Sequence, residues 1–186
     1  MNLTGWVQGT FLSGQLTDTA TLVYLALIPF VLSVSLLLWW RRRAVFSSYV
    51  AAMVLTSYAA LVTFVLMPTA PPWLGGAAVN LVSRSGLEAL PGYLAPLAYV
   101  YIPDYFAAFP SLHAAYLITG AYFLFRVGRR LGVAGAAAVA ATLFSTLYLG
   151  QHYAVDLIGG AAYSLVQCVI SERFRLASRA AASPGP

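Results

Sequence analysis

The sequence STLYLGQHYAVDLIGG (Ser145–Gly160) contains one of the two histidines and one of the five acidic residues of the chain. His152 and Asp156 stand four residues apart, which on a helix places them on one face, one turn apart. A carboxylate behind an imidazole can fix the tautomer of the ring and stabilise its charged form. Apolar segments flank the pair on both sides, so we expect one helix to end and another to begin here.

The chain as a whole has the composition of an integral membrane protein. Of its 186 residues, 61% are hydrophobic and only 8% are charged, whereas soluble domains carry about 25% charged residues. About 20 helical residues cross the hydrocarbon core, and a helix satisfies its own backbone groups there. The sequence therefore predicts an all-α integral membrane protein, a bundle of about five transmembrane helices at about 21–40, 45–67, 111–125, 131–149 and 153–170.

The predicted bundle forms one catalytic domain, residues 21–176, between two terminal segments. Residues 1–20 are expected to form either an extracytoplasmic tail or a short interfacial helix, and residues 177–186 a disordered cytoplasmic tail. The connection 68–110 is rich in proline and glycine. Cys168 is the single cysteine, which excludes an internal disulfide and suggests a packing role.

The arginines predict how the bundle crosses the membrane. Nine of the ten basic residues lie at 41–43, at 126–130 and after residue 170, and Arg84 alone lies in the connection 68–110. Excess basic residues mark cytoplasmic segments, so the N-terminus and this connection are expected to be extracytoplasmic. Basic runs can also bind nucleic acid. These clusters lie directly at span ends, so we expect a multi-pass cell-membrane protein with no nucleic-acid partner.

This orientation brings both histidines to one membrane face. Ser111 and His113 open the third predicted span at its outer end, and His152 and Asp156 open the fifth span at the same end. An ionisable residue inside the bilayer costs about 2.5–3.5 kcal/mol on insertion scales, so such residues are usually functional. We therefore expect these four residues to form a site at the extracytoplasmic face.

Such a site has the groups needed for chemistry on a phosphate ester. Asp156 is expected to accept a hydrogen bond from one ring nitrogen of His152, whose other nitrogen attacks phosphorus and becomes phosphorylated. Protonated His113 gives its proton to the departing alcohol, and Ser111 binds phosphate oxygens with the N–H groups of the helix start. Water as the second acceptor makes a phosphatase, and an alcohol makes a transferase.

At these residues the sequence resembles the type 2 phosphatidic acid phosphatase superfamily of integral-membrane lipid phosphatases and phosphotransferases. Its Pro-Ser-Gly-His block is matched by residues 110–113, with Leu112 in place of glycine. Its block of Ser-Arg, five residues, His, three residues and Asp aligns with residues 145–156, with Thr146 at the arginine position. A further block, Lys, six residues and Arg-Pro, is absent, and the chain has no lysine.

Three segments resemble one branch, the inositol phosphorylceramide synthases and their bacterial relatives. They are PTAPPW at 68–73, FPSLHA at 109–114 and the segment from His152 to Gly160, with Gln151 where the branch commonly has a histidine. The resemblance covers about residues 65–165. It implies a metal-independent phosphotransferase without a cofactor, with His152 as nucleophile, that moves a phospho-headgroup such as phosphoinositol between lipids.

The missing lysine and arginines leave the charge of the phosphate to other groups. We expect Arg84, Tyr148 and Tyr153 to join Ser111 as substrate ligands. A solvated or interfacial loop position is the alternative for Arg84. Gly159 and Gly160 are expected to allow close helix packing.

Several alternatives to this function are open from the sequence. The protein could be a lipid phosphate phosphatase, its histidines and Asp156 could hold zinc, or it could be a non-catalytic membrane scaffold or carrier. The sequence does not determine the donor lipid, the acceptor or the oligomeric state.

Overall fold

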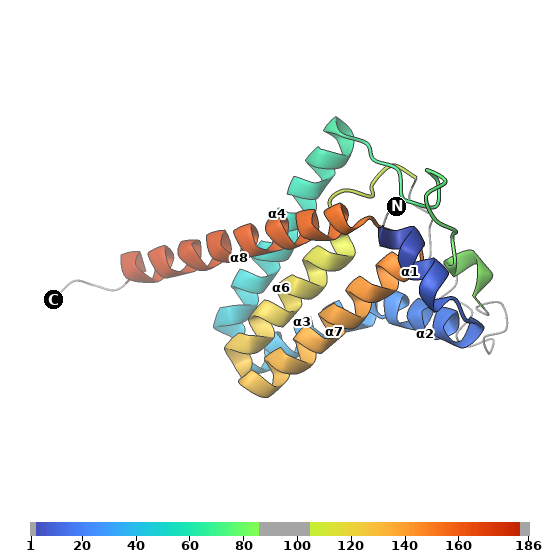
Figure 1. The fold of residues 1–186 in the computed structure, drawn as a ribbon. Helices are drawn as coiled ribbons and strands as arrows, with labels where there is room; N and C mark the ends of the chain where they lie inside the picture. Colours follow the sequence, from blue (N-terminus) through green and yellow to red (C-terminus); the bar gives the residue numbers. More distant parts are fainter. Residues whose placement is uncertain (1–2, 86–104, 183–186) are drawn as a thin grey trace.

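The computed structural model describes residues 3–85 and 105–182, which are mostly helical (Figure 1). The helices are α1 (Leu3–Phe11), α2 (Gly14–Leu25), α3 (Leu27–Arg41), α4 (Arg43–Leu66), the 3₁₀ turn η1 (Val82–Arg84), α6 (Leu112–Val127), α7 (Arg129–Tyr148) and α8 (Ala154–Ala182). The described residues contain no strand, only an isolated bridge between Thr69 and Ala107. The predicted all-α class is confirmed.

Four helical segments are long and apolar enough to cross a membrane. They are Gly14–Arg41, Arg43–Leu66, Arg129–Tyr148 and Ala154–Ala177. α6 is apolar but shorter, with 16 residues, or about 24 Å of helix. The protein is therefore a multi-pass membrane protein with four to five spanning helices, in agreement with the predicted bundle.

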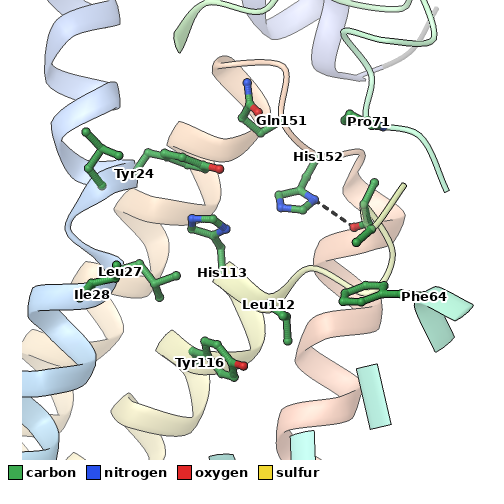
Figure 2. A pocket seen from close by; sticks show the side chains of 13 residues that line it. Tyr24, Leu27, Ile28, Phe64, Pro71, Leu112, His113, Tyr116, Gln151 and His152 are labelled. Atoms are coloured by element: carbon green, nitrogen blue, oxygen red, sulfur yellow. Dashed lines mark hydrogen bonds between the residues drawn. The ribbon is translucent and has the colours of Figure 1, made fainter. Parts of the chain in front are cut away.

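The first span is longer than predicted and is broken. It begins at Gly14, where Ser13 caps α2 by accepting a hydrogen bond from the Leu16 N–H, and it changes helix at Ala26. Pro29 has no N–H to offer the Leu25 carbonyl, so the helical ladder is interrupted here. Leu25, Leu27 and Ile28 flank the break and line a cavity (Figure 2).

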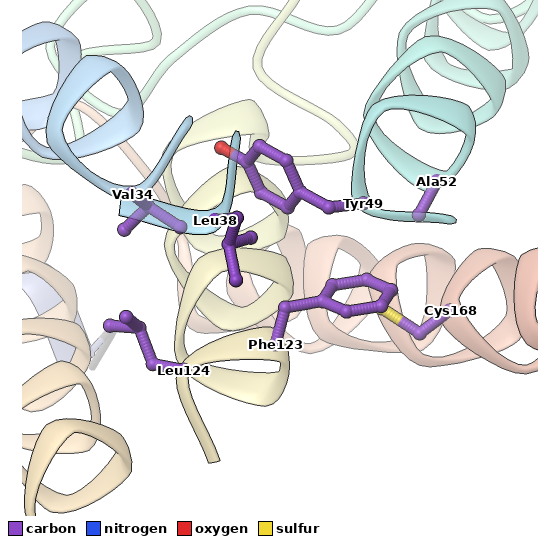
Figure 3. Packing of buried hydrophobic residues seen from close by; sticks show 7 residues of the cluster. All are labelled: Val34, Leu38, Tyr49, Ala52, Phe123, Leu124 and Cys168. Carbon is purple, nitrogen blue, oxygen red and sulfur yellow. The ribbon is translucent and has the colours of Figure 1, made fainter. Parts of the chain in front are cut away.

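α6 is the central helix of the bundle. It contacts α3, α4, α7 and α8 (Figure 1). A buried cluster joins four of these helices (Figure 3), made of Val34, Leu38, Tyr49, Ala52, Phe123, Leu124 and Cys168. The thiol of Cys168 therefore lies in the core, as its apolar surroundings in the sequence suggest.

The N-terminal helices pack on α7 and on the turn that follows it. α1 and α2 both contact α7, and a second buried cluster joins them to the end of α7, made of Val7, Ala20, Leu81, Val82, Tyr148 and Leu149. The Gln8 side chain donates to the carbonyls of Val79 and Tyr148, at 2.7 and 2.9 Å. Residues 3–11 thus form a helix that packs against the end of α7.

α8 extends further than the sequence suggests. It continues to Ala182, so residues 177–182 are helical where we expect a disordered tail. Alanine and arginine, which make up five of these six residues, are among the strongest helix formers. Residues 183–186 of the predicted tail lie outside the described residues. The C-terminal part of α8 projects beyond the other helices (Figure 1).

Candidate active site

The turn between α7 and α8 carries His152 and is fixed from several sides. The N–H groups of Gln151 and His152 both donate to the Thr146 carbonyl, at 3.0 and 3.3 Å. Thr4 of α1 donates to the His152 carbonyl at 3.2 Å. Gly150 has φ of +78°, a conformation that side chains other than glycine rarely adopt. The backbone of His152 is therefore held before any substrate arrives.

The start of α6 is attached directly to the start of α8. The Ser111 N–H donates to the Asp156 carbonyl at 3.0 Å, and the buried Ser111 hydroxyl caps α6 by accepting from the Ala114 N–H. A side chain at Gly160 would collide with the Ser111 carbonyl. The two sequence blocks that carry the histidines therefore meet in space, as predicted.

The His152 ring is buried and its orientation is set by two oxygen atoms. Its Nδ1 lies 3.1 Å from the Ala108 carbonyl, the hydrogen bond dashed in Figure 2. The Oδ2 atom of Asp156 is 3.6 Å from the same nitrogen and accepts from the Tyr153 N–H at 2.7 Å. A carbonyl can only accept, so the proton of the neutral ring lies on Nδ1 and the lone pair on Nε2.

This arrangement differs in one respect from the sequence-based expectation. The carboxylate of Asp156 lies beside His152 at ion-pair distance, but the hydrogen bond of Nδ1 goes to a backbone carbonyl. The carboxylate of Asp156 accepts its short hydrogen bond from the Tyr153 N–H at the start of α8. An acidic side chain in this position caps the free N–H groups of a helix start.

His113 faces His152 across the cavity. The two ring centroids are 5.9 Å apart, with an angle of 60° between the planes. The cavity has a volume of about 290 Å³. It is lined by Tyr24, Leu25, Leu27, Ile28, Phe64, Pro71, Ala107, Ala108, Leu112, His113, Tyr116, Gln151 and His152 (Figure 2). Two imidazoles thus share one cavity whose remaining wall is largely apolar.

The four predicted substrate ligands do not line this cavity. Ser111 lies behind it as the cap of α6. Tyr153 is half-buried with its hydroxyl against Gly75, and the Arg84 side chain is exposed on η1. Tyr148 is fully buried, and its hydroxyl lies 2.8 Å from the Thr17 hydroxyl, so it ties α7 to α2. The substrate-binding roles of these residues stay predictions.

Several residues of the cavity wall are not among the site residues expected from the sequence. Tyr24 and Phe64 come from α2 and α4, whose spans carry no motif. Both lie at the end of the bundle that carries the histidines, since they share the cavity with them. Their positions near the outer ends of the first and second predicted spans are a signal that could have identified them.

The described residues contain no group of three His, Cys, Asp or Glu side chains placed to hold a metal ion. Thr146, at the position of the superfamily arginine, is buried and its hydroxyl donates to the Leu143 carbonyl. It therefore takes part in α7 rather than in the cavity.

Fold and site together define a multi-pass helical membrane protein in which two imidazoles share one cavity. The chain belongs to the PAP2 superfamily, which it matches over residues 1–170. This confirms the resemblance of its sequence blocks to a superfamily of lipid phosphatases and phosphotransferases.

One curated relative carries a more specific name. The inositol phosphorylceramide synthase catalytic subunit aur1 of Schizosaccharomyces pombe is 30% identical over 120 residues, which cover 59% of this chain and 28% of the relative. The chain therefore aligns with little more than a quarter of the relative's length. No solved structure matches the chain.

Proposed function

We propose that this protein is a membrane phosphotransferase that acts on lipid phosphate esters through a phosphohistidine at His152. The observation that carries the proposal is the pair of imidazoles on one cavity, with the Nδ1 of His152 held by the Ala108 carbonyl. The Nε2 lone pair is then available as a nucleophile.

The reaction takes two displacement steps. In the first, the Nε2 lone pair of His152 forms the bond to phosphorus while the bond to the leaving alcohol breaks, and His113 gives that oxygen its proton. In the second, His113 takes the proton of the acceptor hydroxyl, whose oxygen bonds to phosphorus as the N–P bond breaks. Each proton transfer is typically worth about 10²–10⁴-fold in rate. No step calls for a metal ion.

The first turn of α6 is the proposed phosphate-binding element. The N–H groups of Leu112 and His113 precede the first helical hydrogen bond, and both residues line the cavity. A helix start favours an anion through these N–H groups and the helix dipole. This element compensates for the lysine and arginines that the chain lacks at the superfamily positions, with Arg84 and Tyr153 as further candidates from the sequence.

The apolar part of the cavity supports a lipid as substrate. Leu25, Leu27, Ile28, Phe64 and Leu112 line it beside the histidines, and an apolar wall favours a hydrocarbon chain over a free phosphate ester. Transfer between lipids is favoured over hydrolysis because the relative that matches this chain is named as a synthase. The positive-inside rule predicts that this site lies on the extracytoplasmic side, with the C-terminus in the cytoplasm.

The test is to incubate purified protein in lipid with ³²P-labelled phosphatidylinositol or phosphatidic acid, with and without alcohol acceptors. Label on a new lipid, lost in His152→Ala, is the expected result and identifies the acceptor. Release of inorganic phosphate alone, also lost in His152→Ala, would instead make the protein a phosphatase. Full activity of both His113→Ala and His152→Ala would refute the mechanism.

A further inference from the structure

Tyr24 stacks on the ring of His113. The ring centroids are 4.2 Å apart and the planes differ by 21°. Tyr24 is on the last turn of α2, directly before the break at Ala26, and its side chain is half-buried. It packs against the second buried cluster, which joins α1, α2 and the end of α7. The phenol ring therefore lies between this cluster and the ring of His113.

Among the residues that the structure describes, no acidic side chain lies at ion-pair distance from His113 to support its protonated form. The ion pairs among the described residues are Arg126–Glu172, Arg175–Glu172 and His152–Asp156, and none involves His113. Asp156 serves the other imidazole. His113 makes two ring contacts among the described residues. The centroid of Tyr24 is 4.2 Å from that of His113, closer than the centroid of His152 at 5.9 Å. A cation over such a face is attracted by the ring quadrupole.

We propose that Tyr24 is a positioning residue for His113. Its ring holds the imidazole in the plane from which it protonates the leaving alcohol, and its face favours the protonated imidazole. The inference rests on the proposed function, because it requires His113 to be the general acid. Tyr24 acts through His113 and makes no bond to the substrate.

A general acid matters only when the leaving group needs a proton, and this provides the test. Two alkyl phosphodiesters are compared in a single turnover, one with an aliphatic alcohol as leaving group and one with 4-nitrophenol. The second leaving group departs as a stable anion. Loss of proton donation therefore slows the first ester and spares the second, whereas a folding defect slows both.

We expect Tyr24→Leu to cleave the aliphatic ester about 10–100-fold more slowly, as misplacement of a catalytic group predicts, and to cleave the nitrophenyl ester within about threefold of the wild-type rate. Tyr24→Phe keeps the ring and should restore both rates. Added to His113→Gln, Tyr24→Leu should cause no further loss, because the two residues act as one unit. Tyr58→Leu, on the exposed face of α4, is the matched control.

The inference is overturned if Tyr24→Leu slows both esters equally, if its effect multiplies with that of His113→Gln, or if Tyr24→Phe is as slow as Tyr24→Leu. Should Tyr24→Leu not fold, Tyr24→Met, with a flexible side chain that fills irregular space, takes its place in the same comparison. If wild-type protein cleaves neither ester, the proposed function itself fails. If wild-type protein cleaves the esters and Tyr24→Leu slows both equally, the role of Tyr24 is refuted while the proposed function stands.

Discussion

Two oxygen atoms lie near Nδ1 of His152, one from a backbone carbonyl and one from a carboxylate. The Ala108 carbonyl, at 3.1 Å, accepts the hydrogen bond of the Nδ1–H group, and the Asp156 carboxylate, at 3.6 Å, adds negative charge beside the ring. In the proposed mechanism, the carbonyl orients the neutral ring, and the carboxylate stabilises the positive charge that develops on the ring as Nε2 attacks. Ring orientation and charge compensation are therefore carried by separate groups.

This division of labour sets the expected cost of Asp156→Asn. The variant keeps an oxygen for the Tyr153 N–H and loses the negative charge, while the Ala108 carbonyl still fixes the tautomer. We expect turnover to fall about 10–100-fold, less than the roughly 10⁴-fold loss when such a substitution also reverses the tautomer. Steady-state rates and a thermal melt measure this. A loss of 10⁴-fold in a stably folded variant would show that the carboxylate, not the carbonyl, sets the tautomer.

For single residues, the sequence identified the side chains of the candidate site but not the backbone groups that hydrogen-bond to them. His113, His152, Asp156 and Ser111 were predicted from spacing, and the structure brings them together. The Ala108 carbonyl could not be predicted, because every residue has a carbonyl and only the fold decides which one reaches Nδ1. The sequence predicts Tyr148 as a substrate ligand, but its hydroxyl makes a hydrogen bond with the hydroxyl of Thr17 in α2. No sequence motif indicates that α2 packs against α7.

The contact between α6 and α8 decides whether the two histidines meet. At the site end it consists of the hydrogen bond from Ser111 to Asp156 and the close approach of Gly160 to the Ser111 carbonyl. Further along, the hydroxyls of Thr119 and Ser164 are 2.9 Å apart. Small residues permit this approach, as in other membrane helix pairs.

Gly160→Ala should push the two helix starts apart. The added methyl group has no space in front of the Ser111 carbonyl, and overpacking typically costs about 1–3 kcal/mol. We expect a lower midpoint of thermal unfolding and at least a roughly tenfold loss of turnover, since the histidines would separate. The midpoint is measured in detergent and the turnover on lipid substrate.

Gly128→Ala is the matched control for this prediction. Gly128 lies between α6 and α7 in extended backbone, and a methyl group there meets nothing within 4 Å. It should leave both unfolding and turnover unchanged. Equal effects of the two substitutions, or none from Gly160→Ala, would contradict the close-packed contact.

The bounds of α4, α6 and α7 agree with the predicted spans to within two residues, because apolar runs end at Arg, Pro or Gly. The first span did not follow this rule. Its polar N-terminal part, with Gln15, Thr17 and Asp18, has too little hydrophobicity to suggest a membrane helix, yet α2 begins at Gly14 and packs on α7. Tertiary contacts stabilise this part of the helix, and a single sequence does not reveal them.

The molecule as a whole is organised by charge asymmetry along the bundle. The arginine clusters lie at one end of the helices, and the cavity with both histidines lies at the other, beside the α2–α3 break. The arginines alone therefore predicted that both histidines share one end. They could not predict the cavity, because its wall combines residues from α2, α3, α4 and α6 that only packing brings together.

The orientation is testable by labelling single cysteines from one side. Cys168 is buried and should not react. Leu12→Cys, in the exposed turn between α1 and α2, should react with a membrane-impermeant maleimide on intact cells. Arg130→Cys, at the start of α7, should react only after permeabilisation. The opposite pattern would place the site in the cytoplasm and contradict the orientation derived from the positive-inside rule.

The proposed mechanism requires that His152 becomes covalently phosphorylated during turnover. The most direct measurement is to mix the protein with ³²P-labelled phosphodiester lipid, quench in base within the first turnover, and map the label by mass spectrometry. A phosphorus–nitrogen bond survives base and breaks in acid. We predict acid-labile label on the peptide that contains His152, present in wild type and absent in His152→Ala. Turnover without such label, or label that persists in His152→Ala, would contradict the mechanism.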